Sequence, residues 1–150
     1  MMRLVVVWGL LAALGCAESV TSESTSVANL SRTETPVLLL PEPYMRSAAV
    51  MAEARWFAID TTEEGLNVHL HGTHAFVEAP AGALGEPPAP NASVRGNPAY
   101  NYVEESVRVL TWMEQGAAYS LDLVCPSEGD ARCADESFIV ELASQTEPVR

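Results

Sequence analysis

Ser106–Cys125 reads SVRVLTWMEQGAAYSLDLVC, and it decides the fold because it predicts a β-hairpin. Two runs rich in β-branched, aromatic and aliphatic residues, Val107–Met113 and Ala118–Val124, flank the connection Glu114–Ala117. Within the connection, Gly116 takes a positive φ without strain, as a tight turn requires. A hairpin of this size is marginal alone, so the sequence predicts more sheet or a helix on its apolar face.

The side chains favour one register for this hairpin. Placing Trp112 opposite Tyr119 sets Leu110 opposite Leu121 and gathers the large apolar side chains on one face. A slip of one residue would exchange the two faces, so only one register can be native. We expect the first register because it joins the aromatic pair on the apolar face.

The flanking segments predict an α+β fold. Arg55–Asp60 and Leu66–His71 form a second hairpin around the turn Thr61–Gly65, and the returning strand alternates apolar with polar residues. Asp135–Gln145 predicts a helix, because Asp135 can cap it and apolar residues recur at helical spacing. We therefore expect an antiparallel sheet of about four to six strands, built of hairpins and covered by the C-terminal helix. The apolar stripe of that helix comprises Phe138, Ile139, Leu142 and Ala143.

Other segments carry local predictions. Val37–Leu40 is a short apolar run that predicts a strand or an extended entry segment. Arg46–Ala54 is rich in alanine and predicts a short helix. A bulge at Gly72 would let the preceding strand continue over Thr73–Glu78. Residues 79–101 hold five of the ten prolines and predict a long surface loop.

The N-terminus carries an apolar run, Leu4–Leu14, behind one arginine. This run is too short to span a membrane and is typical of a secretory signal. With the sequence ALGC at residues 13–16, it resembles the leader of bacterial lipoproteins, although leucine is more usual at position 13. The resemblance implies cleavage before Cys16, lipidation of the Cys16 thiol and a stable membrane anchor. The alternative is ordinary cleavage near Gly15 or Ala17, which would release a free secreted protein.

These features predict three parts of the chain. Residues 1–15 are a signal peptide, and residues 16–36 are the lipidated cysteine with a disordered tether rich in Ser, Thr and Glu. Residues 37–150 are one small globular domain. By resemblance to Gram-negative sorting, Ala17 after the cysteine favours the outer membrane over the inner membrane. The domain would then face the periplasm or the cell surface.

The two remaining cysteines, Cys125 and Cys133, frame a short loop that carries Pro126 and Gly129. In an exported protein whose Cys16 is lipidated, a Cys125–Cys133 disulfide is the natural pairing. The alternative is a redox pair. The spacing is not Cys-x-x-Cys, and no His or Lys adjacent in the sequence would lower a thiol pKa. The pattern therefore does not favour a redox pair.

The charge of the chain excludes some partners. The net charge is −12, and all eight basic residues are arginine. Such a balance argues against binding to nucleic acid and against electrostatic docking on anionic lipid. The acidic residues are scattered along the chain, which is typical of a solvated surface.

All three histidines lie in one short run, His69, His71 and His74. Two of them, His69 and His71, project from the same face of the predicted strand, a geometry that lets two imidazoles share a metal ion. With His74 as a third ligand and Glu78 as a candidate fourth, this run predicts a zinc or copper site. The alternative is a solvent-facing polar strip on an amphipathic strand.

The order of motifs in the domain resembles that of a known group. The chain passes Leu-Pro-x-x-Tyr at residues 40–44, Val-x-Gly at 94–96 and Trp-x-Glu-x-Gly-x-x-Tyr at 112–119, before a helix that starts with acidic residues. This order is similar to that of the MucB-like β-sheet domains of bacterial envelope proteins, which act beside anti-sigma factors. The resemblance implies a sensing or interaction module without catalysis. The proline-rich insert and the cysteine pair depart from that pattern.

The functional hypotheses follow from these observations. The sequence holds neither a nucleophile motif nor a phosphate-binding glycine-rich loop. The leading hypothesis is therefore a lipid-anchored, non-catalytic binding or structural module without a cofactor, which acts on an envelope protein partner. The second hypothesis is a metal-binding lipoprotein that uses the three histidines. An enzyme is the third, with no candidate catalytic residues.

Overall fold

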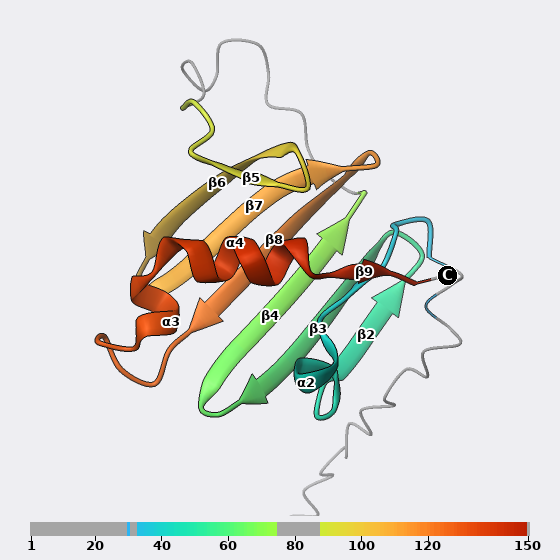
Figure 1. Cartoon of the computed structure of the whole chain (residues 1–150). Helices are drawn as coiled ribbons and strands as arrows, with labels where there is room; N and C mark the ends of the chain where they lie inside the picture. Colours follow the sequence, from blue (N-terminus) through green and yellow to red (C-terminus); the bar gives the residue numbers. More distant parts are fainter. Residues whose placement is uncertain (1–29, 31–32, 75–87, 150) are drawn as a thin grey trace, which may run out of the picture.

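The computed structural model describes Leu30, residues 33–74 and residues 88–149 (Figure 1). The predicted signal peptide, the predicted lipidation site Cys16 and most of the predicted tether lie outside these residues. Glu78 and the first part of the predicted proline-rich loop also lie outside them. Among the helices that the structure describes, none is long and apolar enough to cross a membrane.

The described part of the chain is mostly antiparallel sheet with a few helices, so the predicted α+β class is confirmed in outline. The main sheet has seven strands, more than the four to six predicted, because residues 49–53 and 92–94 add edge strands. One helix, α4, crosses one of its faces (Figure 1). In spatial order these strands are β2 (Ala49–Glu53), β3 (Trp56–Glu63), β4 (Leu66–Thr73), β8 (Ala117–Val124), β7 (Val107–Glu114), β6 (Asn97–Glu104) and β5 (Ala92–Val94). The other elements are β1 (Leu38–Leu39) paired with β9 (Glu147–Pro148), and the helices α2 (Glu42–Met45), α3 (Ala131–Ala134) and α4 (Glu136–Ser144).

The central hairpin of β7 and β8 has the predicted register. Trp112 lies opposite Tyr119, and Leu110 lies opposite Leu121. The connection is shorter than predicted, because only Gln115 and Gly116 lie outside the strands. Both have positive φ, 51° and 78°, as a type I′ turn requires. The hairpins β3–β4 and β5–β6 close with turns of the same kind.

The face of the sheet under α4 holds the core. As predicted, Asp135 caps this helix, because its carboxylate accepts a hydrogen bond of 2.8 Å from the backbone N–H of Ser137. The buried side of the helix carries Ile139, Leu142 and Ala143. On the same face of the sheet the strands contribute fully buried side chains, among them Phe57, Ile59, Leu70, Leu110, Leu121 and Leu123. The predicted lid on the central hairpin is therefore present.

The predicted bulge at Gly72 is wrong. Gly72 pairs regularly, opposite Phe57 on β3 and Tyr119 on β8. A Cβ atom at this position would lie 2.2 Å from Cε1 of Phe57 and 2.9 Å from Cε1 of Tyr119. Two aromatic rings occupy the space that a side chain at position 72 would need. Close approach of other groups, like a bulge, is a known reason for a glycine inside a strand.

The predicted helix over Arg46–Ala54 is also wrong. Residues 49–53 form β2, an edge strand in which Val50 is buried while Ala49, Met51 and Glu53 are exposed. Helix propensity is a weak prior, and pairing with β3 overrides it here. The helix that does form is one turn long, Glu42–Met45, with proline in its first turn.

The predicted loop over 79–101 is shorter than expected at its C-terminal end. Its last part forms β5 and the first half of β6. The side chain of Asn91 supports this by bonding to both backbone groups of Asn101, at 2.8 Å each. Proline is tolerated at the second residue of β6 because the strand is only beginning there. Local composition predicted a loop, whereas pairing with β7 decided the strand.

The folded part begins before Val37. Leu30 and Thr35 are buried, and the hydroxyl group of Thr35 donates a 2.7 Å hydrogen bond to the carbonyl oxygen of Arg55. The phenol of Tyr119 donates a 2.9 Å bond to the carbonyl oxygen of Pro36. The end of the segment predicted as a tether is therefore part of the packed domain.

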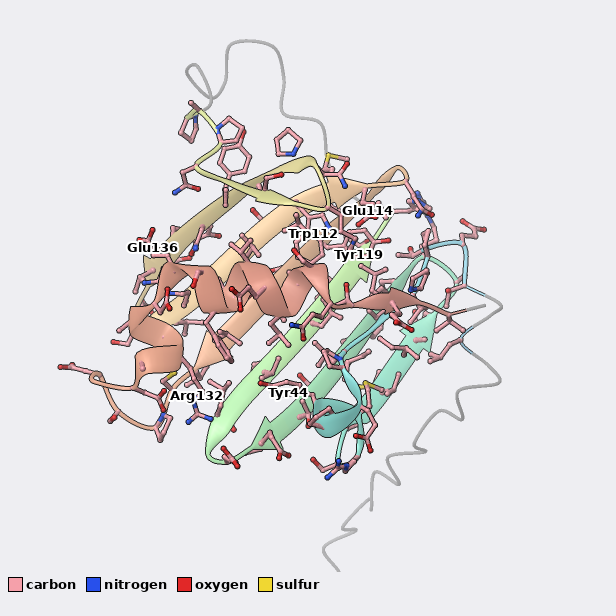
Figure 2. All side chains as sticks on the ribbon, in the orientation of Figure 1. Tyr44, Trp112, Glu114, Tyr119, Arg132 and Glu136 are labelled. Carbon is pink, nitrogen blue, oxygen red and sulfur yellow. A yellow bond between two sulfur atoms is a disulfide. The ribbon has the colours of Figure 1, made fainter. Side chains whose placement is uncertain are left out.

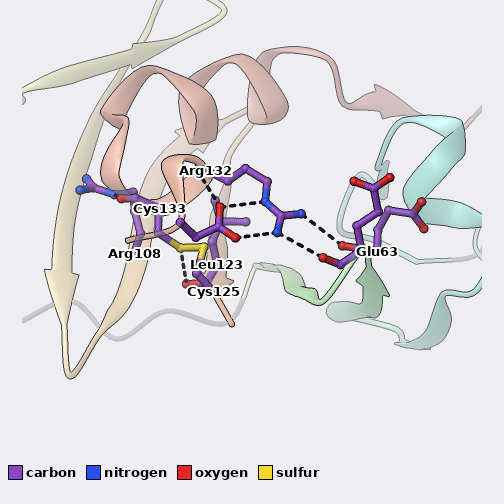
Figure 3. Close-up of a disulfide and its surroundings, with 8 residues drawn as sticks. Glu63, Arg108, Leu123, Cys125, Arg132 and Cys133 are labelled. Carbon is purple, nitrogen blue, oxygen red and sulfur yellow. Dashed lines mark hydrogen bonds and ion pairs between the residues drawn. A yellow bond between two sulfur atoms is a disulfide. The ribbon is translucent and has the colours of Figure 1, made fainter. Parts of the chain in front are cut away.

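A disulfide joins Cys125, at the end of β8, to Cys133 in α3 (Figure 3). Nearby, Arg132 contacts Asp130 and also donates to the carbonyl oxygen of Glu64 at 3.2 Å, which ties this loop to the β3–β4 turn. Hydrogen bonds from Arg132 lower the pKa of Asp130 to about 2. By the chain-entropy model, a disulfide closing so short a loop contributes about 2.5 kcal/mol to stability.

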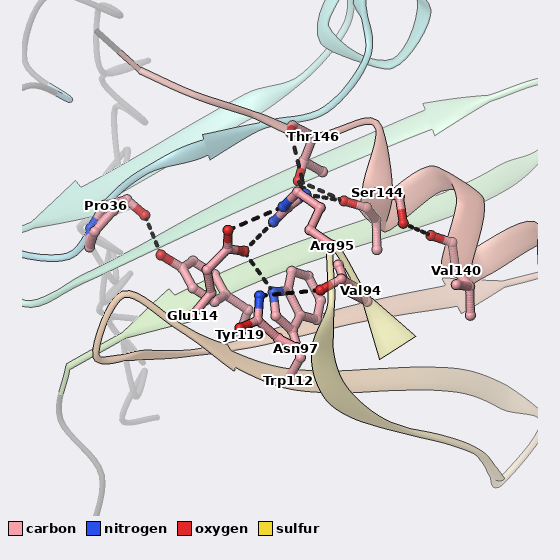
Figure 4. Close-up of polar contacts among 11 residues, drawn as sticks. Pro36, Val94, Arg95, Asn97, Trp112, Glu114, Tyr119, Val140, Ser144 and Thr146 are labelled. Carbon is pink, nitrogen blue, oxygen red and sulfur yellow. Dashed lines mark hydrogen bonds and ion pairs between the residues drawn. The ribbon is translucent and has the colours of Figure 1, made fainter. Parts of the chain in front are cut away.

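A polar cluster joins the ends of several elements beside α4 (Figure 4). Arg95, in the β5–β6 turn, contacts the Glu114 carboxylate and donates a 2.6 Å hydrogen bond to the carbonyl oxygen of Ala143. The hydrogen bond from Arg95 lowers the pKa of Glu114. Figure 2 shows Glu114 beside Trp112 and Tyr119, whose rings stack with centroids 5.3 Å apart. This cluster anchors the C-terminal end of the helix to the sheet.

The buried phenol of Tyr119 makes the free energy of unfolding decrease at alkaline pH. Burial raises the pKa of its phenol from 10.0 to about 12, and the side chain is only 3% exposed. Between these two pH values the unfolded chain releases the proton while the folded chain retains it, so stability falls as pH rises. We expect Tyr119 to contribute a loss of roughly 1 kcal/mol per pH unit in this window. Burial also raises the pKa of Tyr44, so we expect Tyr119→Phe to reduce the loss without removing all of it. Urea unfolding across the window measures the loss, and an unchanged slope in the variant would contradict this account.

Candidate functional site

The open face is the side of the seven-stranded sheet opposite α4, turned away from the viewer in Figure 1. Alternation along each strand sends every second side chain to this face. Strand pairing lines these side chains up in rows across the sheet. One row is Met51, Ala58, His71, Ser120, Thr111 and Tyr100, and the next is Ala49, Asp60, His69, Asp122, Val109 and Tyr102.

The open face contains an apolar hollow over β4, β8, β7 and β6. The hollow measures about 510 Å³ and continues into a second hollow of about 560 Å³, which shares Tyr100 and Thr111 with it. Both volumes fall in the range typical of ligand sites. Side chains of the open face that line the first hollow include His71, Pro98, Tyr100, Met113, Ala118 and Ser120.

Large apolar side chains are exposed on the open face. Met51 is 44% exposed, Tyr102 43% and Met113 53%. The other large exposed apolar side chain of the described residues, Val103, lies at the end of β6 and belongs to the opposite face by alternation. A concentration of such residues on one side of a small domain marks an interaction surface.

Polar groups lie at the centre of the open face. Nδ1 of His69 lies 2.5 Å from a carboxylate oxygen of Asp60 on β3, and Asp122 of β8 lies opposite His69 on its other side. The hydroxyl group of Ser120 donates a 2.6 Å hydrogen bond to Asp122. This arrangement places two carboxylates beside one imidazole, and the serine hydroxyl bonds to a carboxylate. It is an acidic patch that can bind a positive charge or a hydrogen-bond donor.

The structure separates the three predicted metal ligands. As predicted, His69 and His71 share one face of β4, but the ring of His71 packs near that of Trp56, with centroids 6.5 Å apart. His74 follows the strand and lies toward the β7–β8 turn, where its Nε2 is 3.9 Å from the position of a Cβ on Gly116. Among the described residues, no three His, Cys, Asp or Glu side chains are grouped to hold a metal ion. The zinc or copper prediction thus finds no converged ligand set in this part of the chain.

Several residues of the open face were missed by the sequence analysis. Tyr100 fell in a predicted loop and Met51 in a predicted helix, so neither was assigned to a sheet face. Asp60 and Asp122 were placed on strands, but nothing in the local pattern brings them to either side of His69. The pairing of β4 with β8 does this, and no short-range signal predicts that pairing.

Comparison of the chain with models of protein families, with curated proteins and with solved structures finds no match.

Proposed function

We propose that this protein is a non-catalytic binding module of the bacterial cell envelope, anchored by a lipid on Cys16. The open face of the sheet is its binding surface. The observation that carries the proposal is the asymmetry of the sheet, because α4 covers one face while the other face keeps exposed apolar side chains above a hollow of about 510 Å³.

Two further features support the envelope setting. The lipobox at residues 13–16 resembles that of bacterial lipoproteins, whose acyl chains supply a stable anchor. The Cys125–Cys133 disulfide suits an oxidising compartment outside the cytoplasm. The acidic chain, with a net charge of −12, would not itself be drawn to anionic lipid, so the anchor carries the attachment.

Site-specific photocrosslinking in cells that produce the full chain tests this function. A photoreactive phenylalanine analogue replaces Met113 on the open face. The matched control carries it at Glu141, an exposed position of α4. We expect a discrete crosslinked species from position 113 and none from position 141. Equal labelling at both positions, or labelling at neither, would contradict the assignment of the open face as the binding surface.

A further inference from the structure

The fixed charges of the open face have one sign. Four carboxylate side chains lie at strand positions that face this side of the sheet. Among the described strand residues, no arginine occupies such a position, and the protein contains no lysine. The four carboxylates belong to Glu53, Asp60, Glu104 and Asp122.

The described arginines are engaged elsewhere. Arg95 pairs with Glu114, and Arg132 pairs with Asp130. Arg108 is buried on the covered face, where it donates a 2.5 Å hydrogen bond to the carbonyl oxygen of Cys133. Arg46 pairs with Glu42 beside α2, and Arg55 lies in the β2–β3 turn near the carboxylate of Glu34. None of these guanidinium groups forms an ion pair with a carboxylate of the open face. Within the face, Asp60 has a contact with Nδ1 of His69 at 2.5 Å. The rest of the negative charge of the face is left for a partner to neutralise.

The same face also offers apolar contact. Exposed methionine side chains are polarizable and adapt to irregular apolar partners, and both Met51 and Met113 are exposed here. From β2 to β6 the row that begins at Met51 and ends at Tyr100 crosses six strands. At ordinary strand spacing this row spans about 24 Å, which matches a helix of about 16 residues.

We propose that the open face docks a cationic, amphipathic polypeptide segment. The apolar side of the segment lies on the hollow beside Tyr100 and Met113, and its Lys or Arg side chains meet Asp60 and Asp122. This inference rests on the proposed function, because it names the chemistry of the partner that the open face binds. Charge complementarity of this kind raises association rates and disfavours acidic partners.

Binding of a designed peptide tests the partner chemistry. The protein is the full chain with Cys16→Ser, and the probe is a fluorescent 16-residue peptide (about the length of the row) with leucine on one helical side and lysine on the other. A second peptide carries glutamate in place of every lysine. We expect saturable binding of the lysine peptide, at least roughly tenfold tighter than binding of the glutamate peptide, and weaker binding as salt is raised.

Two double variants distinguish the effect of the open-face carboxylates on peptide binding from the effect of the net charge of the protein. Asp60→Asn with Asp122→Asn removes two charges from the open face, whereas Glu141→Gln with Glu147→Gln removes two from exposed positions on α4 and β9. We expect the first pair to weaken binding at least roughly fivefold and the second pair to change it less than twofold. Equal losses from both pairs would overturn the proposal, because binding would then follow net charge alone. Thermal unfolding of each variant verifies that the fold persists.

The outcomes distinguish this inference from the function on which it rests. If position 113 crosslinks in cells but the lysine peptide binds no better than the glutamate peptide, the cationic partner is wrong and the binding face stands. If neither experiment gives a signal, both proposals fail. A second copy of the chain is the alternative occupant of the open face, and sedimentation velocity of the full chain tests this alternative. A dimer that Met113→Glu converts to a monomer would show that a second copy covers the face.

Discussion

Gly72→Ala is expected to destabilise the fold by about 3 kcal/mol, at the upper end of what overpacking a core usually costs. The added methyl group would lie 2.2 Å from Cε1 of Phe57 and 2.8 Å from its Cζ. Phe57 is fully buried, and its ring lies 6.3 Å from that of Tyr119, so it has little room to retreat. Urea unfolding of the full chain with Cys16→Ser measures the change in free energy.

Gly129→Ala is the matched control for this change. A Cβ at Gly129 would meet nothing within 4 Å, so the same addition of one methyl group should leave stability within about 0.5 kcal/mol. Phe57→Leu supplies a second check, because it removes the ring that the new methyl group meets. Combined with Gly72→Ala, it should destabilise by less than the sum of the two single changes. Simple additivity would show that the contact with Phe57 is not the cause.

Ile139→Ala is expected to cost about 3 kcal/mol, the middle of the range for truncating a buried aliphatic side chain. Ile139 is the largest side chain of α4 that is fully buried in the core. Its removal leaves a cavity between the helix and the central hairpin. Amide hydrogen exchange should show the helix losing protection before β4 and β8 do, because the helix then opens without unfolding the sheet.

Glu141→Ala is the control on the same helix. Glu141 is exposed, so its truncation should change the free energy of unfolding by less than about 0.5 kcal/mol. A loss below about 1 kcal/mol for Ile139→Ala, or simultaneous loss of protection throughout the sheet, would contradict the role of α4 as a separately docked lid.

The prediction of the fold was most successful where the signal is short-range. The register of the β7–β8 hairpin followed from pairing Trp112 with Tyr119, and the start of α4 followed from the cap at Asp135. The Cys125–Cys133 pair is joined within a short loop. In each case the deciding contacts connect residues close in the chain, so local patterns contain the information.

The prediction of the candidate site was less complete, for a physical reason. Placing His69 between Asp60 and Asp122 requires β8 to pair with β4 across a long stretch of chain, and nothing local encodes that neighbour. Likewise, Met51 reached the open face only because β3 recruits residues 49–53 as an edge strand against their alanine-rich composition. The metal hypothesis required three nearby histidines to converge, and among the described residues no three His, Cys, Asp or Glu side chains are grouped to hold a metal ion.

By itself the sequence determined the α+β class, the central register, the closing helix and the acidic charge of this protein. These depend on periodicity, caps and composition, which act within one or two neighbouring elements. Only the tertiary structure decided that Gly72 makes room for two aromatic rings, and that the sheet keeps one face open. Both depend on which strands become neighbours and on where α4 lies, and such long-range packing has no signature in a local pattern.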